Sequence, residues 1–381
     1  AVLIAQYGLV AVASLLYTTD FGRTQAGVIS YVKDSLIVVA VTLLLQRKTT
    51  LRRAVWALLA AGIIMGTLSV IQQLTGDFEN TYGGFAVASV KNIVGSSSDY
   101  RIGGPVKSPN FYALILVPLV PLALNRLWEE ESAWRRGVAG WAAAVCILSI
   151  IFTFSRGGFL ALVVVLGLTF VRRSLRPLTV LATVAALALL VQFVPAQYVA
   201  RLSTLGDVAS GNVEQEVSFR GRSSEIIVAW RMFADHPFTG VGYNDFKTHY
   251  LRYSEQLGLD PRSEDRSAHS LYLEVAAETG LLGLFSLGAI LWAMFKGLYQ
   301  ARKQLARAGL PDYAGLVEAY GIGLIGYLTG SLFLHMAFPR FFWLLVGIAL
   351  VVPHVAAVET QPQRRRAVAG QPAGMGLPVK L

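Results

Sequence analysis

The chain has 381 residues, of which 54% are hydrophobic and 15% are charged, and its mean hydropathy is +0.54. This is too little charge to cover a soluble globule of that length, so the composition excludes a soluble enzyme and indicates an integral membrane protein. The net charge of +10 does not point to nucleic acid, because the basic residues cluster at the ends of apolar runs, where they set membrane orientation.

Apolar runs long enough to cross a bilayer recur along the chain. A bilayer core about 30 Å thick needs about 20 apolar residues in a helix. We therefore predict an all-α polytopic helical bundle with about ten spans in this chain, and about 12 in the full protein because the sequence begins inside an apolar run. The predicted spans are 1–17, 25–45, 54–74, 110–127, 138–154, 157–171, 177–194, 270–298, 314–334 and 341–358.

Basic residues concentrate on alternate connections between these spans. They lie in the segments 46–53, 126–136, 172–176 and 296–309 and in the tail, whereas the short connections around Arg23, Arg156 and Arg340 carry one each. The positive-inside rule places the first group in the cytoplasm. Two longer loops, at about 75–109 and at 195–269, then face the periplasm.

This topology predicts four regions. They are transmembrane helices over 1–194 with the loop at about 75–109, a large outer loop with short helices over 195–269, C-terminal transmembrane helices over 270–358, and a disordered cytoplasmic tail over 359–381. The large outer loop is rich in arginine, and long translocated loops are largely exempt from the charge rule. Its arginines therefore need an explanation other than orientation.

Four short stretches meet at the predicted outer face. RIGGPVKSPNFYALIL (101–116) breaks regular structure just before a span. TFSRGGFLAL (153–162) places Arg156 in a turn between two spans. FRGRSSEIIVAWRMFADHPFTGVGYNDF (219–246) has an arginine-rich start, a helix pattern and a glycine turn, and EDRSAHSLYLEVAAETGLLGLF (264–285) runs from a polar loop into a span.

In order, spacing and topology these stretches resemble the O-antigen ligase family, within the wider ligase and O-antigen polymerase superfamily, over roughly residues 50–350. That family has an arginine in an S-R-G turn after a span, and a large periplasmic loop with G-R, a tryptophan helix, a G-x-G turn, a histidine motif and a downstream E-x-G. The matching residues here are Ser155-Arg156-Gly157, Gly221-Arg222, Trp230, Gly240-Val241-Gly242, Ala268-His269 and Glu278-Thr279-Gly280. One departure is Ser270, where asparagine commonly follows the histidine.

The resemblance implies an inverting glycosyltransferase of lipopolysaccharide biosynthesis in the bacterial inner membrane, with its catalytic loop over 195–269. Its donor would be O-antigen polysaccharide on undecaprenyl diphosphate, and its acceptor lipid A–core at the periplasmic face. The departing diphosphate gains negative charge, which a metal ion or fixed cations must stabilise. The sequence has no Asp-x-Asp pair and no tight outward cluster with metal spacing, so we predict that arginine serves instead, without metal or cofactor.

Arg156 and Arg222 are the predicted diphosphate-binding residues, because a guanidinium offers permanent, bidentate contacts to phosphate oxygens. Arg222 is preferred to Arg220 by motif position alone. His269 is the predicted general base, since an imidazole changes protonation near neutral pH. His335 is the second choice for that role.

Supporting roles are open for six further residues: Arg220, Lys107, Glu274, Glu278, His335 and Arg340. Glu274 and Glu278 stand four apart and share one helix face. Either they favour the positive N-terminal end of the helix, or one of them orients His269 or an arginine. Arg156 and Lys107 have the alternative of contacting lipid phosphates.

Two rival functions remain at this stage. An O-antigen polymerase or a protein O-oligosaccharyltransferase of the same superfamily would use the same donor and a different acceptor. A small-anion transporter would line a pore with its arginines, but transporters tend to have repeats and sites near the midplane, whereas the basic residues here gather at the outer face. The predicted partners are the lipid-linked glycan, lipid A–core and membrane lipids, with no nucleic acid.

Overall fold

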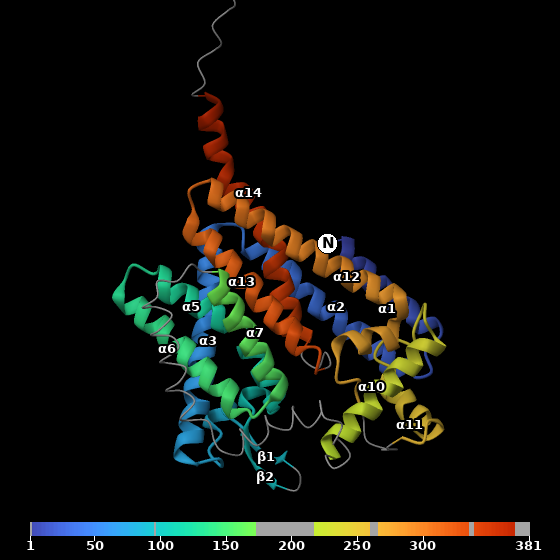
Figure 1. Cartoon of the computed structure of the whole chain (residues 1–381). Helices are drawn as coiled ribbons and strands as arrows, with labels where there is room; N and C mark the ends of the chain where they lie inside the picture. Colours follow the sequence, from blue (N-terminus) through green and yellow to red (C-terminus); the bar gives the residue numbers. More distant parts are fainter. Residues whose placement is uncertain (1, 95–96, 173–216, 260–265, 335–338, 370–381) are drawn as a thin grey trace, which may run out of the picture.

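Long helices make up most of the structure, a computed structural model that describes residues 2–94, 97–172, 217–259, 266–334 and 339–369 (Figure 1). The bundle consists of α1 (Val2–Ala13), α2 (Phe21–Leu44), α3 (Lys48–Thr75), α4 (Pro109–Leu116), α5 (Leu119–Glu129), α6 (Ala133–Phe152), α7 (Arg156–Arg172), α12 (Leu271–Arg307), α13 (Pro311–Gly330) and α14 (Pro339–Ala369). Two further helices, α10 (Val217–Asp235) and α11 (Phe246–Gln256), lie in the segment 195–269 that we predicted to be the large outer loop.

Six of the described helices are long and apolar enough to cross a membrane. They are Phe21–Leu44, Lys48–Thr75, Pro109–Glu129, Ala133–Phe152, Leu271–Arg307 and Arg340–Gln361, and Val2–Leu16 is a shorter apolar helix. The predicted spans at 157–171 and 314–334 coincide with α7 and α13, while the one at 177–194 lies outside the described residues. A multi-pass membrane protein is therefore supported, and the count of about ten spans stays a prediction.

The structure is predominantly helical, as the all-α prediction expected, and adds two details to it. The loop at 75–109 contains an antiparallel hairpin of β1 (Ala88–Val94) and β2 (Ser97–Ile102), in which Ser89 lies opposite Arg101. The last helix, α14, continues to Ala369, whereas we predicted a disordered tail from residue 359. Composition favoured disorder there, but a helix already formed extends at little cost into polar sequence.

The segment Pro109–Glu129 is the centre of the bundle. Within its apolar stretch, 83% of the residues are buried inside the protein. The corresponding share for α2, at the periphery, is 22%. Pro118 and Pro121 follow the end of α4 and divide the segment into α4 and α5, because proline removes a helix hydrogen bond. Gly326 of α13 packs so closely here that a Cβ atom would lie 2.2 Å from Val165 and 2.7 Å from Val117. Small residues of this kind let membrane helices approach each other.

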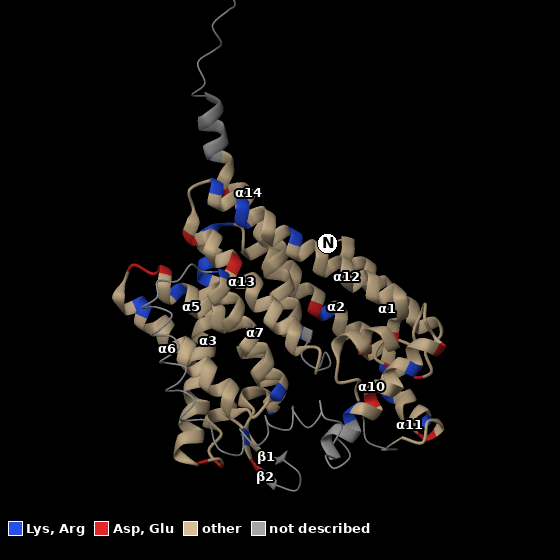
Figure 2. Cartoon of the chain, in the orientation of Figure 1, with Lys and Arg blue, Asp and Glu red and all other residues tan. Residues whose placement is uncertain are grey.

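The connections rich in Lys and Arg lie at one end of the bundle and form ion pairs there (Figure 2). We call this end the basic end. Arg126 Nη2 lies 2.6 Å from Asp312 Oδ1, and Lys48 Nζ lies 3.4 Å from Glu359 Oε2. Since α6 starts at this end and α12 finishes there, the turn at Arg156 and the start of α12 lie at the opposite end, the motif end. The four motif stretches therefore lie at the motif end, where fewer of the connections are rich in Lys and Arg.

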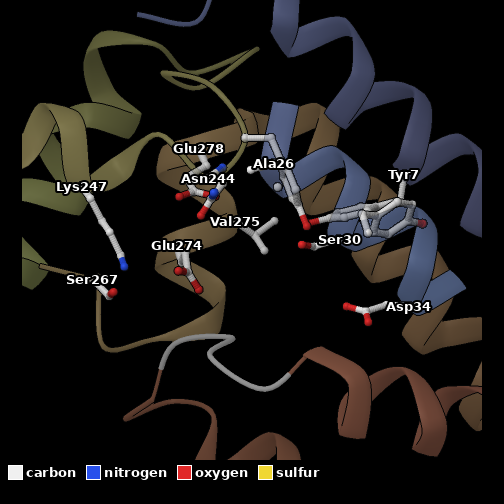
Figure 3. Close-up of a pocket in the computed structure, with 13 residues that line it drawn as sticks. Tyr7, Ala26, Ser30, Asp34, Asn244, Lys247, Ser267, Glu274, Val275 and Glu278 are labelled. Atoms are coloured by element: carbon white, nitrogen blue, oxygen red, sulfur yellow. Dashed lines mark hydrogen bonds between the residues drawn. The ribbon is translucent and has the colours of Figure 1, made fainter. Parts of the chain in front are cut away.

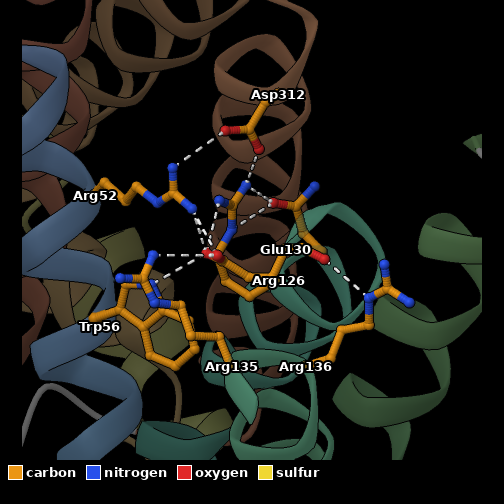
Figure 4. Close-up of polar contacts among 8 residues, drawn as sticks. Arg52, Trp56, Arg126, Glu130, Arg135, Arg136 and Asp312 are labelled. Carbon is orange, nitrogen blue, oxygen red and sulfur yellow. Dashed lines mark hydrogen bonds and ion pairs between the residues drawn. The ribbon is translucent and has the colours of Figure 1, made fainter. Parts of the chain in front are cut away.

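Glu130 is the centre of the charge network at the basic end (Figure 4). Its buried carboxylate accepts two hydrogen bonds of 2.7 Å from Arg52 Nη2 and one of 3.3 Å from Trp56 Nε1, and lies 3.5 Å from Arg126 Nη1. Burial by itself raises the pKa of Glu130, but the bonds and charge of Arg52 outweigh it, so the pKa lies below its ordinary value of 4.5. The folded state thus favours the ionised form. Its stabilising contribution is present above pH 4.5 and is lost as the pH falls through the lowered pKa.

We predict that Glu130→Gln destabilises the protein by about 3 kcal/mol, because it leaves Asp312 as the one carboxylate of this network that pairs with Arg52 and with the buried Arg126. Thermal unfolding of the purified protein in detergent, followed by tryptophan fluorescence at pH 7, should show a midpoint several degrees lower. Glu131→Gln, the matched control at an exposed position, should change the midpoint little. Equal midpoints for the two variants would contradict a structural role for the network.

Candidate active site

His269 lies at the point where the chain enters α12. It precedes Ser270, the N-cap of α12, and its backbone is left-handed with φ of 46°. A left-handed conformation costs a non-glycine residue about 1–2 kcal/mol, and such strain clusters at functional sites. The amide of Leu271, two residues on, donates to the carbonyls of Ser331 (3.0 Å) and Leu334 (2.9 Å), which fixes this junction to the end of α13.

Glu225 is the acidic partner of His269, and the sequence analysis did not single it out. Its carboxylate, 1% exposed, lies 3.5 Å from His269 Nε2 through Oε2 and 3.3 Å from Arg266 Nη1 through Oε1. The imidazole itself is 32% exposed and so is reachable from solvent. A carboxylate in this position orients an imidazole and stabilises its protonated form. The sequence pattern that could have identified Glu225 is its spacing, because Glu225 stands three residues after Arg222 and shares its helix face.

Arg156 and Arg222, which are far apart in the sequence, line the same cavity. The other lining residues are Asn110, Ser155, Gly157, Phe333 and Leu334. Arg156 is the first residue of α7, and Ser155 Oγ accepts a hydrogen bond of 3.2 Å from the amide of Gly158. Two guanidinium groups at a helix N-terminus form a site suited to an anion. The cavity measures ≈ 10 Å³, room for about one water, so a diphosphate would require these side chains to move apart.

Arg101 ties the first motif stretch to this cavity and was also missed from the sequence. Its side chain, 5% exposed, donates from Nε to the carbonyl of Thr153 (2.7 Å) and from Nη2 to Asn110 Oδ1 (3.1 Å). The hairpin strand β2 carries Arg101 to the turn that precedes Arg156. Arg101 therefore holds both the S-R-G turn and Asn110 in place.

Glu278 has a structural role, which answers one of the questions left open by the sequence. Its buried carboxylate accepts hydrogen bonds from the backbone amides of Asn244 (2.8 Å) and Phe246 (3.3 Å). The amides of Val241 and Gly242 also donate to the carbonyls of Ala277 (2.9 Å) and Glu278 (3.0 Å). The E-x-G motif thus binds the backbone of the G-x-G turn.

The two motif glycines permit this contact. A Cβ atom on Gly240 would lie 2.2 Å from the carbonyl carbon of Glu278, and one on Gly280 would lie 2.4 Å from that of Phe238. Gly280 also breaks the regular helix of α12, with φ of 60° and ψ of −155°. We call the contact between residues 237–246 and 277–282 the glycine interlock.

Asp245 fixes the interlock to the N-terminal helices. Its Oδ2 accepts hydrogen bonds from the hydroxyl of Thr18 (2.8 Å) and the amide of Thr19 (3.0 Å), and it lies 3.4 Å from His249 Nε2. Burial raises the pKa of Asp245, but hydrogen bonds from His249, Thr248 and Thr18 outweigh it and lower the pKa to about 2. The carboxylate therefore stays ionised at every pH at which the enzyme would work.

A second cavity, of ≈ 370 Å³, opens beside the histidine motif (Figure 3). It is lined by Tyr7, Ala26, Gly27, Ser30, Tyr31, Asp34, Tyr243, Asn244, Lys247, Ser267, Glu274, Val275 and Glu278. Three carboxyl groups against one lysine make it acidic, so we call it the acidic cavity. Ser267 and Glu274 bring the chain on both sides of His269 to its wall, with Lys247 beside them (Figure 3). Its volume lies in the range of about 300–1,000 Å³ that is common for small-molecule sites.

The remaining predicted site residues lie apart from these contacts. Arg340 is 78% exposed and its Nε lies 3.6 Å from Asp34 Oδ1, at the wall of the acidic cavity. Lys107 is exposed, with φ of 58°, directly after the short helix η3 (Gly104–Val106). The side chain of Arg220 and the whole of His335 lie outside the described residues. In the described part of the chain no group of three or more His, Cys, Asp or Glu residues could hold a metal ion, and metal independence stays a prediction.

We predict that Gly280→Ala destabilises the protein by about 3 kcal/mol, the sum of a left-handed backbone and a steric clash with the Phe238 carbonyl group. The measurement is the midpoint of thermal unfolding in detergent. Gly288→Ala in the same helix is the matched control, because nothing lies within 4 Å of its added Cβ, and it should leave the midpoint unchanged or raise it. Similar midpoints for both variants would show that the interlock is not required.

Comparison with known protein families agrees with these motifs. Residues 141–288 match the family model described as O-Antigen ligase. This segment is less than half of the chain, but it contains Arg156, Arg222, Glu225 and His269. No curated protein matches the chain. The matched segment is similar to the O-antigen ligase family, which agrees with the resemblance predicted from the motifs.

Proposed function

We propose that the protein is an inverting, metal-independent glycosyltransferase that moves O-antigen polysaccharide from undecaprenyl diphosphate to a sugar of lipid A–core, at the periplasmic face of the inner membrane. One observation carries the proposal. Along α10, Arg222 lines the cavity that also contains Arg156, and Glu225, one turn later, lies 3.5 Å from His269. A single helix therefore connects an anion-binding pair to an imidazole that can act as a base.

The donor diphosphate would bind between Arg156 and Arg222. Both side chains carry a permanent positive charge, and the N-terminus of α7 adds a partial positive charge. Asn110, held by Arg101, supplies a further polar group at the same cavity. These groups would stabilise the charge that develops on the leaving diphosphate, which is the main electrostatic requirement of the reaction.

His269 would take the proton of the acceptor hydroxyl. Nε2 faces Glu225, so Nδ1 is the atom to accept that proton, and because Nδ1 is buried in the structure the ring would have to turn towards the acceptor. Glu225 stabilises the imidazolium that forms, in the way that the acidic member of a catalytic triad does. Glu225 acts through His269 and is a positioning residue.

The transfer would then occur in one displacement. The acceptor oxygen forms a bond to the anomeric carbon, the bond from that carbon to the diphosphate oxygen breaks, and the diphosphate leaves with the electron pair. The hydroxyl proton passes to His269. Attack from the side opposite the leaving group inverts the anomeric centre, so no covalent sugar intermediate forms on the protein.

The acceptor sugar would enter through the acidic cavity. Ser267 and Glu274 flank the histidine motif on either side, and carboxylate and hydroxyl groups such as Asp34 and Ser30 can bond sugar hydroxyls.

Variants of the proposed base test this mechanism. Purified protein is supplied with lipid-linked O-antigen and rough lipopolysaccharide in the presence of a chelator, and products are separated on a gel. His269→Ala should lower the transfer rate about 100-fold or more, because general base catalysis contributes about 10²–10⁴-fold. Glu225→Gln should lower the rate less and move the acidic limb of the pH–rate profile to lower pH, because the protonated imidazole loses its stabilising carboxylate.

The same assay distinguishes the rival functions. Elongation of the lipid-linked glycan without rough lipopolysaccharide would favour a polymerase. Anion flux into liposomes with no transfer would favour a transporter. Transfer that persists in His269→Ala, or an unshifted pH profile in Glu225→Gln, would contradict the assigned roles.

The arginine pair makes a separate prediction. Arg156→Gln and Arg222→Gln should each lower the transfer rate at least about tenfold, because a hydrogen bond to a charged group contributes about 1.5–3 kcal/mol. Arg156→Lys should recover part of the loss, since lysine keeps the charge and loses the bidentate geometry. Arg252→Gln, at an exposed position of α11, is the control and should retain the full rate. An equal loss in the control would indicate a general electrostatic effect of the loop.

A further inference from the structure

A separate cavity of ≈ 580 Å³ opens at the basic end, on the opposite side of the bundle from His269. It lies between the first turns of α3 and α6 and the start of α13. Its lining residues are Thr49, Arg52, Arg53, Trp56, Trp134, Arg135, Val138 and Tyr313. The proposed transfer reaction makes no use of this cavity, which we call the basic cavity.

The basic cavity presents positive charge only. Arg52, Arg53 and Arg135 line it, and none of its lining residues is acidic. The carboxylates of Glu130 and Asp312 pair with these arginines (Figure 4): Glu130 lies 2.7 Å from Arg52 and 3.7 Å from Arg135, and Asp312 lies 3.8 Å from Arg52. These pairs hold Arg52 in place, while Arg53 and Arg135 are exposed on the open side.

Three helices begin around the basic cavity, and this adds to its positive potential. α3 starts at Lys48, α6 at Ala133 and α13 at Pro311, and all three are at least 20 residues long. The N-terminus of a helix carries a partial positive charge of about half a unit. Asp312 offsets part of this charge at α13, but its carboxylate is already bonded to Arg126 (2.6 Å).

Aromatic side chains place the basic cavity at the membrane surface. Trp134 is 79% exposed, and Trp56 is partly buried with its Nε1 donating to Glu130 (3.3 Å). Both stand in the first turns of helices that are long and apolar enough to span a bilayer. Tryptophan prefers the level of the lipid head groups, where one part of the ring is apolar and the N–H is wet.

We propose that the basic cavity binds the head group of an anionic phospholipid. The phosphodiester would contact Arg53 and Arg135, Arg52 would form the charged floor, and the first part of an acyl chain would lie on Trp134. Basic pockets between membrane helices are the expected sites for such head groups. A zwitterionic lipid fits less well, because its cationic group would meet a wall without an acidic residue.

The test is native mass spectrometry of the intact protein in detergent, titrated with phosphatidylglycerol or, separately, phosphatidylcholine. The intact protein should retain phosphatidylglycerol in preference. Arg53→Gln with Arg135→Gln should weaken this binding at least about tenfold, since each basic residue near an anionic lipid contributes about fivefold. The matched control, Lys296→Gln with Lys303→Gln, removes two positive charges elsewhere on the basic half of the bundle. In the intact protein these amines lie over Trp292 (4.2 Å) and Tyr299 (4.3 Å). This control variant should bind phosphatidylglycerol as the intact protein does.

Several outcomes would overturn the proposal. They are equal retention of the two lipids, equal binding by the two double variants, and displacement of the lipid by millimolar inorganic phosphate, which would indicate a soluble anion as the occupant. Arg53→Lys with Arg135→Lys should keep most of the binding, and this separates loss of charge from loss of folding. None of these outcomes depends on glycosyl transfer, so the proposed function and the lipid site can fail independently.

Discussion

The site depends on the glycine interlock, a contact between two stretches of backbone at the motif end. The carboxylate of Glu278 accepts hydrogen bonds from the amides of Asn244 and Phe246, and neighbouring backbone amides donate to carbonyls across the contact. A buried carboxylate is costly unless it is fully hydrogen-bonded, so the turn and the helix break require each other. Since α10 leads into this turn and packs on α12, the interlock also fixes the distance between Glu225 and His269.

The two glutamates at the start of α12 occupy equivalent positions on the helix, but the tertiary structure gives them different surroundings. Both Glu274 and Glu278 lie on one helix face and line the acidic cavity, but Glu278 is buried and bonded to backbone amides, while Glu274 is partly exposed beside the histidine motif. Helix geometry gives both residues the same direction. The surroundings of each side chain depend on the segment before α12, which covers Glu278 more completely than Glu274.

The bundle has different polar chemistry at its two ends. At the basic end, arginines of the short connections pair with Glu130 and Asp312 and surround the basic cavity. At the motif end, arginines and carboxylates from distant segments meet in small groups around Arg156 and His269. The positive-inside rule predicts that the charge at the basic end orients the chain in the membrane, whereas the arrangement at the motif end has the form of a reaction site.

The sequence by itself determined the membrane class and placed apolar helices where the described residues are helical, and its motifs singled out Arg156, Arg222 and His269. Hydropathy and short motifs carry this information because they are local. Only the tertiary structure revealed Glu225 beside His269 and Arg101 beside Thr153, 52 residues away in the chain. It also brought Arg156 and Arg222 to one cavity. Such pairings depend on how helices and loops pack, and a single sequence does not encode them in any local pattern.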